Sequence, residues 1–398
     1  MNIKKYLTVG AIAVAAILML ASAGFAAEDI SLGFDDKEIR IAQLAPLSGP
    51  AAPWGVLARA GGAVFQMIND EGGIHGRKIK FFLRDDQYNP AQAKVVAKEV
   101  VEKHGIFAFV AGMGTAVQMA YKDYLIQKGI VWVNPASGGN EFKFPLTDTI
   151  FNMYPVYEDE ASILTKYIVE DLKIKKIGMI YQNDPYGLDA LKGVQKRLAV
   201  HKMKLVEAVP TEPTEKDFSS QVLKLKNSGA EAVIMWLVPN PAVITMKTAA
   251  TLNYKPQWFT TSTLSDFPTM NRLTNGLWEG VVAACWVEPP DSNTPLVNRY
   301  REMHKKYTPR DIWGTNYLAG VAYVEPLVDA LQRVGKNLSR KAFIDALNKT
   351  DFKGVGPRIT WTPTQHQGVD SIYVAKCGPN GKMIKLKDWT RNDMASWK

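Results

Sequence analysis

Short apolar runs alternate with longer amphipathic stretches along most of the chain. Apolar runs that predict strands lie at 39–44, 79–83, 106–110 and 130–133. The stretches between them predict helices at 55–70, 90–104 and 116–128. Strands that alternate with helices indicate a parallel sheet covered on both faces. Their uninterrupted apolar character suits strands that are buried on both sides.

The same rhythm then begins again. Further strands are predicted at 176–181, 204–209, 232–237, 258–261 and 280–286, with helices at 187–200 and 218–227. Helices near 295–307, 315–334 and 339–348 follow, and a tail with strands at 359–361 and 372–374 ends the pattern.

We therefore predict an α/β fold with two doubly wound parallel-sheet lobes. Lobe 1 is expected to comprise residues 28–153 plus 291–348, and lobe 2 residues 154–290 plus 349–398. The chain would then cross between the lobes near residues 153, 290 and 348, which predicts a three-crossover hinge.

The first residues have the layout of a secretory signal peptide. Lys4 and Lys5 precede an uncharged apolar core from Leu7 to Leu20, and small residues follow it. Residues 1–26 are therefore predicted to be cleaved during export, which would place the mature protein in the periplasm. The alternative is an uncleaved membrane anchor, since the uncharged stretch is long enough to span a bilayer.

The positive net charge does not indicate nucleic-acid binding. The chain has 398 residues and a formal charge of +9, but its basic residues are spread among acidic ones. Interleaved charges of this kind are typical of solvated helix faces. No nucleic acid is therefore expected as a partner.

Neither metal nor catalytic motifs are found in the sequence. The two cysteines, Cys285 and Cys377, lie in apolar surroundings and could form a disulfide or remain as buried thiols. The five histidines are scattered singly, and no Walker, nucleophile-elbow or zinc-protease motif is present. We expect no cofactor, no metal and no enzymatic activity.

Loops at the carboxyl ends of the predicted strands carry the candidate site, because ligands of open parallel sheets bind there. Gly112–Thr115 and Pro135–Gly139 offer free backbone N–H groups and hydroxyls, which can hold a carboxylate without a basic side chain. Four aromatic residues could supply apolar walls, namely Trp54, Tyr186, Trp236 and Trp313.

Several motifs resemble those of one known family. They are Ile41–Gly55, Ile68–Arg77, Asp85-Asp86, Asn134–Ser137, Asp184–Gly187 and Lys216–Phe218. Their order and spacing resemble the periplasmic solute-binding proteins of ABC importers, of the branched-chain amino acid type. The resemblance implies a type I periplasmic binding fold whose lobes close on a small-molecule ligand. It also implies a membrane permease as partner, and a monomer is expected.

The resemblance also assigns roles to single residues. The loop with Met113, Gly114 and Thr115 would grip a ligand carboxylate. The loop with Ala136, Ser137 and Gly138 would bind the same carboxylate. Trp54, Tyr186 and Val238 would form walls of the pocket.

Thr263 lies near the position where amino-acid binders carry an acidic residue for the ligand's ammonium group. A buried ammonium without a partner costs several kcal/mol. The expected ligands are therefore an aromatic or apolar carboxylic acid, or a branched-chain amino acid. A ligand sensor of the same fold and a secreted α/β enzyme remain as alternatives.

Overall fold

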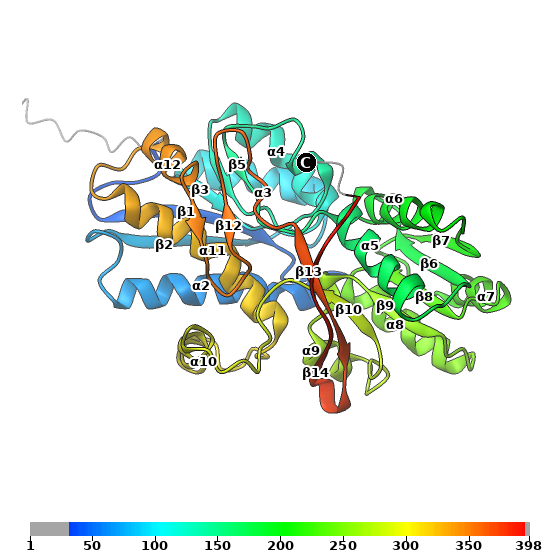
Figure 1. Ribbon diagram of the computed structural model, residues 1–398. Coiled ribbons are helices and arrows are strands. Elements are labelled where there is room, and N and C mark those ends of the chain that lie inside the picture. The colour runs from blue at the N-terminus through cyan, green and yellow to red at the C-terminus, as the bar shows by residue number, and fades with distance from the viewer. Residues whose placement is uncertain (1–31, 395–398) are drawn as a thin grey trace, which may run out of the picture.

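A computed structural model describes residues 32–394 and shows two α/β lobes (Figure 1). The predicted signal peptide at 1–26 lies outside the described residues. Within 32–394, no helix is long and apolar enough to cross a membrane. Each lobe is built on its own sheet, and the chain passes between the lobes three times.

Lobe 1 contains a five-stranded sheet in the order β2-β1-β3-β4-β5, and all its neighbouring strands are parallel. The strands are β1 (Glu38–Ala45), β2 (Lys78–Asp85), β3 (Ala108–Val110), β4 (Val131–Val133) and β5 (Ile150–Phe151). Its helices are α2 (Gly55–Asp70), α3 (Pro90–His104), α4 (Thr115–Gln127), α10 (Pro295–Tyr307), α11 (Thr315–Val334) and α12 (Arg340–Leu347).

Lobe 2 contains a seven-stranded sheet in the order β14-β13-β10-β9-β8-β6-β7. The parallel strands are β6 (Ile177–Gln182), β7 (Glu207–Thr211), β8 (Ala232–Trp236), β9 (Gln257–Thr260) and β10 (Val282–Cys285). The antiparallel strands β13 (Ser371–Cys377) and β14 (Met383–Arg391) extend one edge. The helices are α5 (Tyr157–Lys166), α6 (Pro185–Val200), α7 (Ser219–Asn227), α8 (Pro239–Thr251) and α9 (Phe267–Leu273).

Short helical turns complete the two lobes. They are η2 (Ala52–Trp54), η3 (Asn140–Phe142), η4 (Tyr167–Asp171), η5 (Ser262–Leu264) and η6 (Pro379–Gly381). Local sequence explains several helix starts. The Asn89 side chain accepts hydrogen bonds from Ala91 and Gln92 at the start of α3, and Asp184 accepts one from Gly187 at the start of α6. In both helices a proline occupies the first turn, where a missing N–H group has no cost.

The third crossing lies later in the chain than residue 348, where we expected it. The small sheet of β11 (Asp351–Phe352) and β12 (Ile359–Thr360) leads into a segment that packs on lobe 1. Trp361 lies 5.5 Å from Phe151, measured between ring centroids, and its indole N–H donates to the Asn152 carbonyl at 3.1 Å. Asn152 also forms an isolated β-bridge with Gln367, so the chain leaves lobe 1 only after Gln367. Burial of Trp361 on lobe 1 explains the difference.

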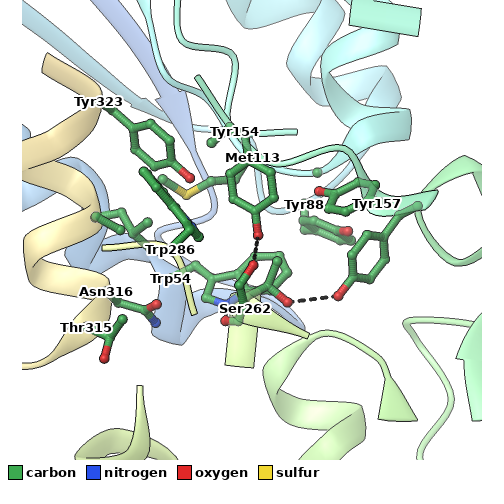
Figure 2. Close-up of a pocket in the computed structure, with 16 residues that line it drawn as sticks. Trp54, Tyr88, Met113, Tyr154, Tyr157, Ser262, Trp286, Thr315, Asn316 and Tyr323 are labelled. Carbon is green, nitrogen blue, oxygen red and sulfur yellow. Dashed lines mark hydrogen bonds between the residues drawn. The ribbon is translucent and has the colours of Figure 1, made fainter. Parts of the chain in front are cut away.

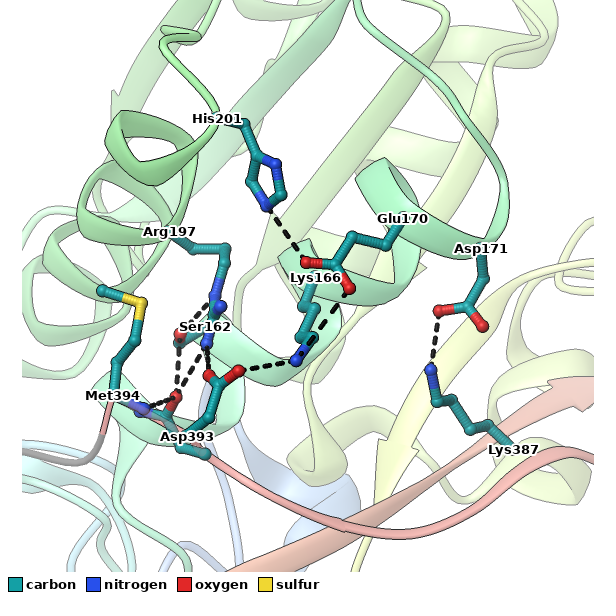
Figure 3. Close-up of polar contacts among 10 residues, drawn as sticks. Ser162, Lys166, Glu170, Asp171, Arg197, His201, Lys387, Asp393 and Met394 are labelled. Atoms are coloured by element: carbon teal, nitrogen blue, oxygen red, sulfur yellow. Dashed lines mark hydrogen bonds and ion pairs between the residues drawn. The ribbon is translucent and has the colours of Figure 1, made fainter.

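Asn392 and Asp393, which follow the edge strand β14 of lobe 2, bind side chains of the helices α5 and α6 (Figure 3). Arg197 of α6 is buried, and its guanidinium pairs with Asp393 and donates to the Asn392 side chain at 3.0 Å. Lys166 of α5 binds the other Asp393 oxygen at 2.6 Å. These contacts hold α5 against α6, and α5 begins at Tyr157 beside the crossing from lobe 1.

The two cysteines are buried free thiols on neighbouring strands β10 and β13. Cys285 stands opposite Tyr373 in this antiparallel pair, whereas Cys377 lies at the far end of β13. Burial raises the pKa of each thiol to about 12. Of the two states considered from the sequence, the structure has the pair of thiols.

Glu325 should make the stability of the protein depend on pH. It is buried in α11, where it accepts hydrogen bonds from Tyr300 at 2.9 Å and from the Val355 N–H at 3.0 Å. Burial raises its pKa from 4.5 to about 7. The stability gained from the protonated form is full below about pH 4.5 and is lost as the pH rises through about 7.

Replacing Glu325 by glutamine should remove this loss, because the amide can accept from Val355 and donate to Tyr300. We expect the unfolding free energy of Glu325→Gln, relative to the unmodified protein, to rise by about 2 kcal/mol between pH 5 and pH 8. Urea unfolding of both proteins across this range measures the difference, and other buried acids cancel in it. A difference that stays constant with pH would contradict the assignment.

Candidate functional site

A pocket lies where the two lobes meet (Figure 2). Its lining residues come from both lobes and from the crossings. They are Trp54, Leu57, Tyr88, Met113, Gly114, Ala136, Tyr154, Tyr157, Tyr186, Ser262, Thr263, Trp286, Thr315, Asn316, Ala319 and Tyr323. Seven of these side chains are aromatic, and none is charged.

The aromatic side chains form two groups. Near the crossings, the Trp286 ring lies 5.4 Å from Tyr323 and 5.5 Å from Tyr154. In the second group, Tyr157 lies 5.0 Å from Tyr186, and it also lies 5.6 Å from Tyr154, so the two groups are in contact. Figure 2 shows Tyr323 and Trp286 on one side of the pocket, with Tyr88 and Tyr157 on the other. The pocket therefore offers broad apolar surfaces on both sides.

Hydrogen bonds join the two lobes around the pocket. The Trp54 indole N–H of lobe 1 donates to the Thr263 carbonyl of lobe 2 at 3.0 Å. The Gln182 amide donates to the Tyr88 hydroxyl at 3.2 Å, and the Asn240 N–H donates to the Pro50 carbonyl at 3.2 Å. These bonds link residues of opposite lobes, so the structure is a closed form.

Six of the eleven residues predicted for the site line this pocket. They are Trp54, Met113, Gly114, Ala136, Tyr186 and Thr263. Gly114 has a φ of 85°, and a β-carbon there would overlap the Tyr88 ring. Glycine is therefore required at this position for both the backbone conformation and the close approach of Tyr88.

Thr115, Ser137 and Gly138 lie behind the pocket surface rather than on it. The Thr115 and Ser137 hydroxyls are fully buried and 2.8 Å apart. Both hydroxyls and the Gly138 backbone hydrogen-bond to the Tyr157 hydroxyl, which lowers the pKa of this phenol, although burial raises it overall. The groups expected to grip a ligand carboxylate thus hold a tyrosine oxygen.

Val238 and Trp313 also lie outside the lining. Val238 is fully buried at the start of α8. Trp313 lines a separate depression together with Pro290 and Arg301, and its indole N–H donates to the Pro290 carbonyl at 2.8 Å. The Arg301 guanidinium covers the Trp313 ring at 5.5 Å, so this ring already has a partner.

Sequence reasoning missed most of the aromatic lining. Tyr154 and Trp286 stand at the first and second crossings, next to the strands β5 and β10 that precede them. Asn316 and Tyr323 lie along α11, which is distant in sequence from the strand-end loops. Aromatic residues placed within a few positions of a predicted crossing were the available signal.

A buried carboxylate stands directly behind Ser262. Glu160 of α5 accepts hydrogen bonds from the Ser262 N–H at 2.7 Å and from its hydroxyl at 2.8 Å. The Tyr154 hydroxyl lies 2.6 Å from the same Ser262 oxygen. The pKa of Glu160 is raised to about 7, because the effect of burial exceeds the lowering by the hydrogen bonds from Ser262 and Thr261.

The acid nearest to Thr263 in sequence does not reach the pocket. Asp266 caps two helices, accepting from the Thr269 N–H of α9 at 3.2 Å and from the Asn316 N–H of α11 at 3.1 Å. Among residues 32–394, no carboxylate lines the pocket beside Thr263, and Glu160 stands behind Ser262. Within residues 32–394, no group of three or more histidine, cysteine, aspartate or glutamate side chains could hold a metal ion.

The chain is similar to known proteins over most of its length. The family model described as periplasmic binding protein matches residues 38–382. A Leu/Ile/Val-binding protein homolog from Brucella melitensis is 31% identical over 224 residues, which are 54% of this chain and 58% of that protein. The chain thus matches little more than half the length of this curated relative.

Two solved structures share the fold. The fatty acid ABC transporter substrate-binding protein from Thermomonospora curvata has a TM-score of 0.81 at 21% identity and covers 91% of this chain and 94% of its own. A branched chain amino acid ABC transporter structure from Thermus thermophilus with bound valine has a TM-score of 0.80 at 20% identity, with coverages of 90% and 98%.

The family match confirms the prediction of a binding protein rather than an enzyme. The fold shared with the two solved structures confirms the predicted α/β architecture of type I periplasmic binding proteins. By the extent of the family match, the chain belongs to the family of periplasmic binding proteins.

Proposed function

We propose that the protein is the solute-binding component of an ABC importer and captures an aromatic carboxylic acid without an ammonium group in the pocket between its lobes. The observation that carries this proposal is the lining itself, which has seven aromatic side chains and no charged one. An aromatic ring gains from offset or edge contacts with such walls. An ammonium group would lack the direct carboxylate contact that a buried cation needs.

The donors for the ligand carboxylate are expected at the end formed by Tyr88 and Tyr157. The Tyr88 hydroxyl accepts from Gln182, so its own proton is free to donate. The Thr115 and Ser137 hydroxyls share one hydrogen bond, so only one of them donates to Tyr157. Tyr157 also accepts from the Gly138 N–H and keeps its own proton to donate. Gly114, the residue before α4, brings the positive end of that helix to the pocket. These groups can bind an anion without a basic side chain.

The names of similar proteins include both fatty acid and branched-chain amino acid binding. The uncharged lining favours the first kind of ligand, and its aromatic character favours a ring over a long chain. Family membership further supports a periplasmic location, export by the signal peptide at 1–26, and delivery to a membrane permease. Domain closure at the three crossings would trap the solute.

A thermal-shift screen tests the proposal on protein that has been unfolded and refolded to remove bound ligand. Benzoate, phenylacetate, octanoate, leucine and valine form the panel. At about 100 times its dissociation constant, a ligand adds about 2.7 kcal/mol to the unfolding free energy, which is a shift of several degrees. We expect this shift with the aromatic acids and none with the amino acids. Stabilisation by leucine or valine alone would contradict the proposed ligand class.

A further inference from the structure

The wall of the pocket at Ser262 has a fixed hydrogen-bond direction. Glu160 lies behind this wall with no exposed surface, and it accepts from the Ser262 N–H and hydroxyl at 2.7 and 2.8 Å. The Thr261 hydroxyl is its third donor. An ionised carboxylate only accepts hydrogen bonds, so the single hydroxyl proton of Ser262 is directed at Glu160 and away from the pocket.

This arrangement also fixes the direction of the hydrogen bond between Tyr154 and Ser262. Its hydroxyl lies 2.6 Å from the Ser262 oxygen, as Figure 2 shows by a dashed line. Because Ser262 has already given its proton to Glu160, Tyr154 must be the donor in this bond. Ser262 and Tyr154 therefore present only lone pairs to a ligand. A group that donates a hydrogen bond fits here, and a group that only accepts is left unpaired, which is unfavourable in a buried site.

We propose that Glu160 sets the polarity of this wall, so that the pocket selects aromatic carboxylates that carry a ring hydroxyl. This inference rests on the proposed function, since the carboxylate is assigned to Tyr88 and Tyr157. The hydroxyl would donate to Ser262 or Tyr154. Ser262 stands between the pocket and Glu160, so the wall offers oxygen lone pairs and no direct ion pair. Glu160 is thus a positioning residue for Ser262.

The groups that face Glu160 remain uncharged near neutral pH. They are Tyr154, Tyr157, Tyr186, Tyr323 and Cys285. Burial raises the pKa of each of them above its ordinary value. Glu160 itself titrates with a pKa raised by burial to about 7. Once protonated, it can donate to Ser262, and the wall loses its fixed direction.

The test compares ligands that differ in whether their ring substituent can donate a hydrogen bond. Calorimetric titration gives the dissociation constants of 4-hydroxybenzoate and 4-fluorobenzoate, and of the two 3-substituted isomers. The fluoro compounds are the reference because fluorine is small and cannot donate a hydrogen bond. At pH 8 we expect the hydroxyl compound to bind at least about tenfold tighter than its fluoro analogue at one ring position, the effect of one good hydrogen bond. At pH 5.5 this ratio should fall below about threefold.

Two variants identify the group responsible. In Glu160→Gln, the amide can donate to the Ser262 oxygen, which releases the serine proton from its fixed direction. Ser262→Ala removes one acceptor and frees the Tyr154 proton, so that Tyr154 no longer presents only lone pairs to the ligand. Both should lower the ratio at pH 8 to below about threefold. The matched control is Ser265→Ala, which removes a hydroxyl that donates to the Ser262 carbonyl at 2.8 Å and does not line the pocket. It should keep the full ratio.

The outcomes separate this inference from the proposed function. If benzoate binds but the ratio is below threefold at both ring positions, or is unchanged in Glu160→Gln, the assignment to Glu160 is wrong and the proposed function stands. If no aromatic carboxylate binds the unmodified protein, the proposed function fails and the inference fails with it. The pH comparison needs no substitution, so it decides the question even if a variant does not fold.

Discussion

Replacing Gly320 by alanine is expected to lower the unfolding free energy by about 3 kcal/mol, the upper range for overpacking a tight contact. Gly320 lies in α11, where that helix crosses α2, and a β-carbon at this position would overlap the Leu57 carbonyl. The obstacle is backbone, which cannot rotate away. The helices must therefore separate.

The same substitution should weaken ligand binding, because both helices line the pocket. Leu57 comes from α2, and Ala319 and Tyr323 come from α11 on either side of Gly320. Separation of the helices would move these walls apart. We expect binding of the best aromatic acid to weaken at least about tenfold, measured by calorimetry below the melting temperature.

Gly62→Ala is the matched control for Gly320→Ala. Gly62 lies in α2, the helix that Gly320 contacts, but a β-carbon there would be 3.3 Å from the nearest atom, in the Phe81 ring, which can adjust. Alanine is also the better helix former by up to about 1 kcal/mol. This variant should therefore melt at or above the temperature of the unmodified protein. Equal melting temperatures for the two variants would contradict close packing of α2 on α11.

Replacing Trp54 by alanine is expected to weaken ligand binding about 100-fold, or about 2.7 kcal/mol, the size typical of a central aromatic contact. Trp54 is 5% exposed, packs 5.9 Å from the Tyr88 ring and donates its indole N–H to Thr263 across the cleft. Alanine removes a wall of the pocket and a bond that holds the lobes together.

Trp54→Phe separates these two contributions. Phenylalanine keeps an aromatic wall but cannot donate to Thr263, so we expect a loss of less than about tenfold. Trp389→Ala is the control, because Trp389 is 40% exposed on β14 and does not line the pocket. Calorimetric titration with the aromatic acid that gives the largest thermal shift measures all three. Undiminished binding by Trp54→Ala would place the ligand elsewhere.

The fold could be predicted largely from local pattern. Strands such as β1 and β6 are buried on both faces, so they appear in the sequence as uninterrupted apolar runs. The third crossing could not be placed in this way. It depends on Trp361 packing against Phe151, a contact between residues about 210 positions apart in the chain. No local pattern records such a contact.

The site residues that lie in loops after the strands could be predicted from the sequence. Those whose positions depend on the crossings between the lobes could not. Met113, Gly114 and Ala136 lie just after strands β3 and β4, at the carboxyl ends where parallel sheets bind ligands. Tyr157 was missed because its position depends on the first crossing. It lies in the region expected for a ligand carboxylate, against Thr115 and Ser137.

A crystal structure of the protein with the most stabilising aromatic acid tests the central claim most directly. We predict electron density for the acid between the lobes, with its carboxylate at Tyr88 and Tyr157 and its ring between Trp54 and Trp286. Density for the acid in the depression beside Trp313, with the interlobe pocket empty, would contradict the account.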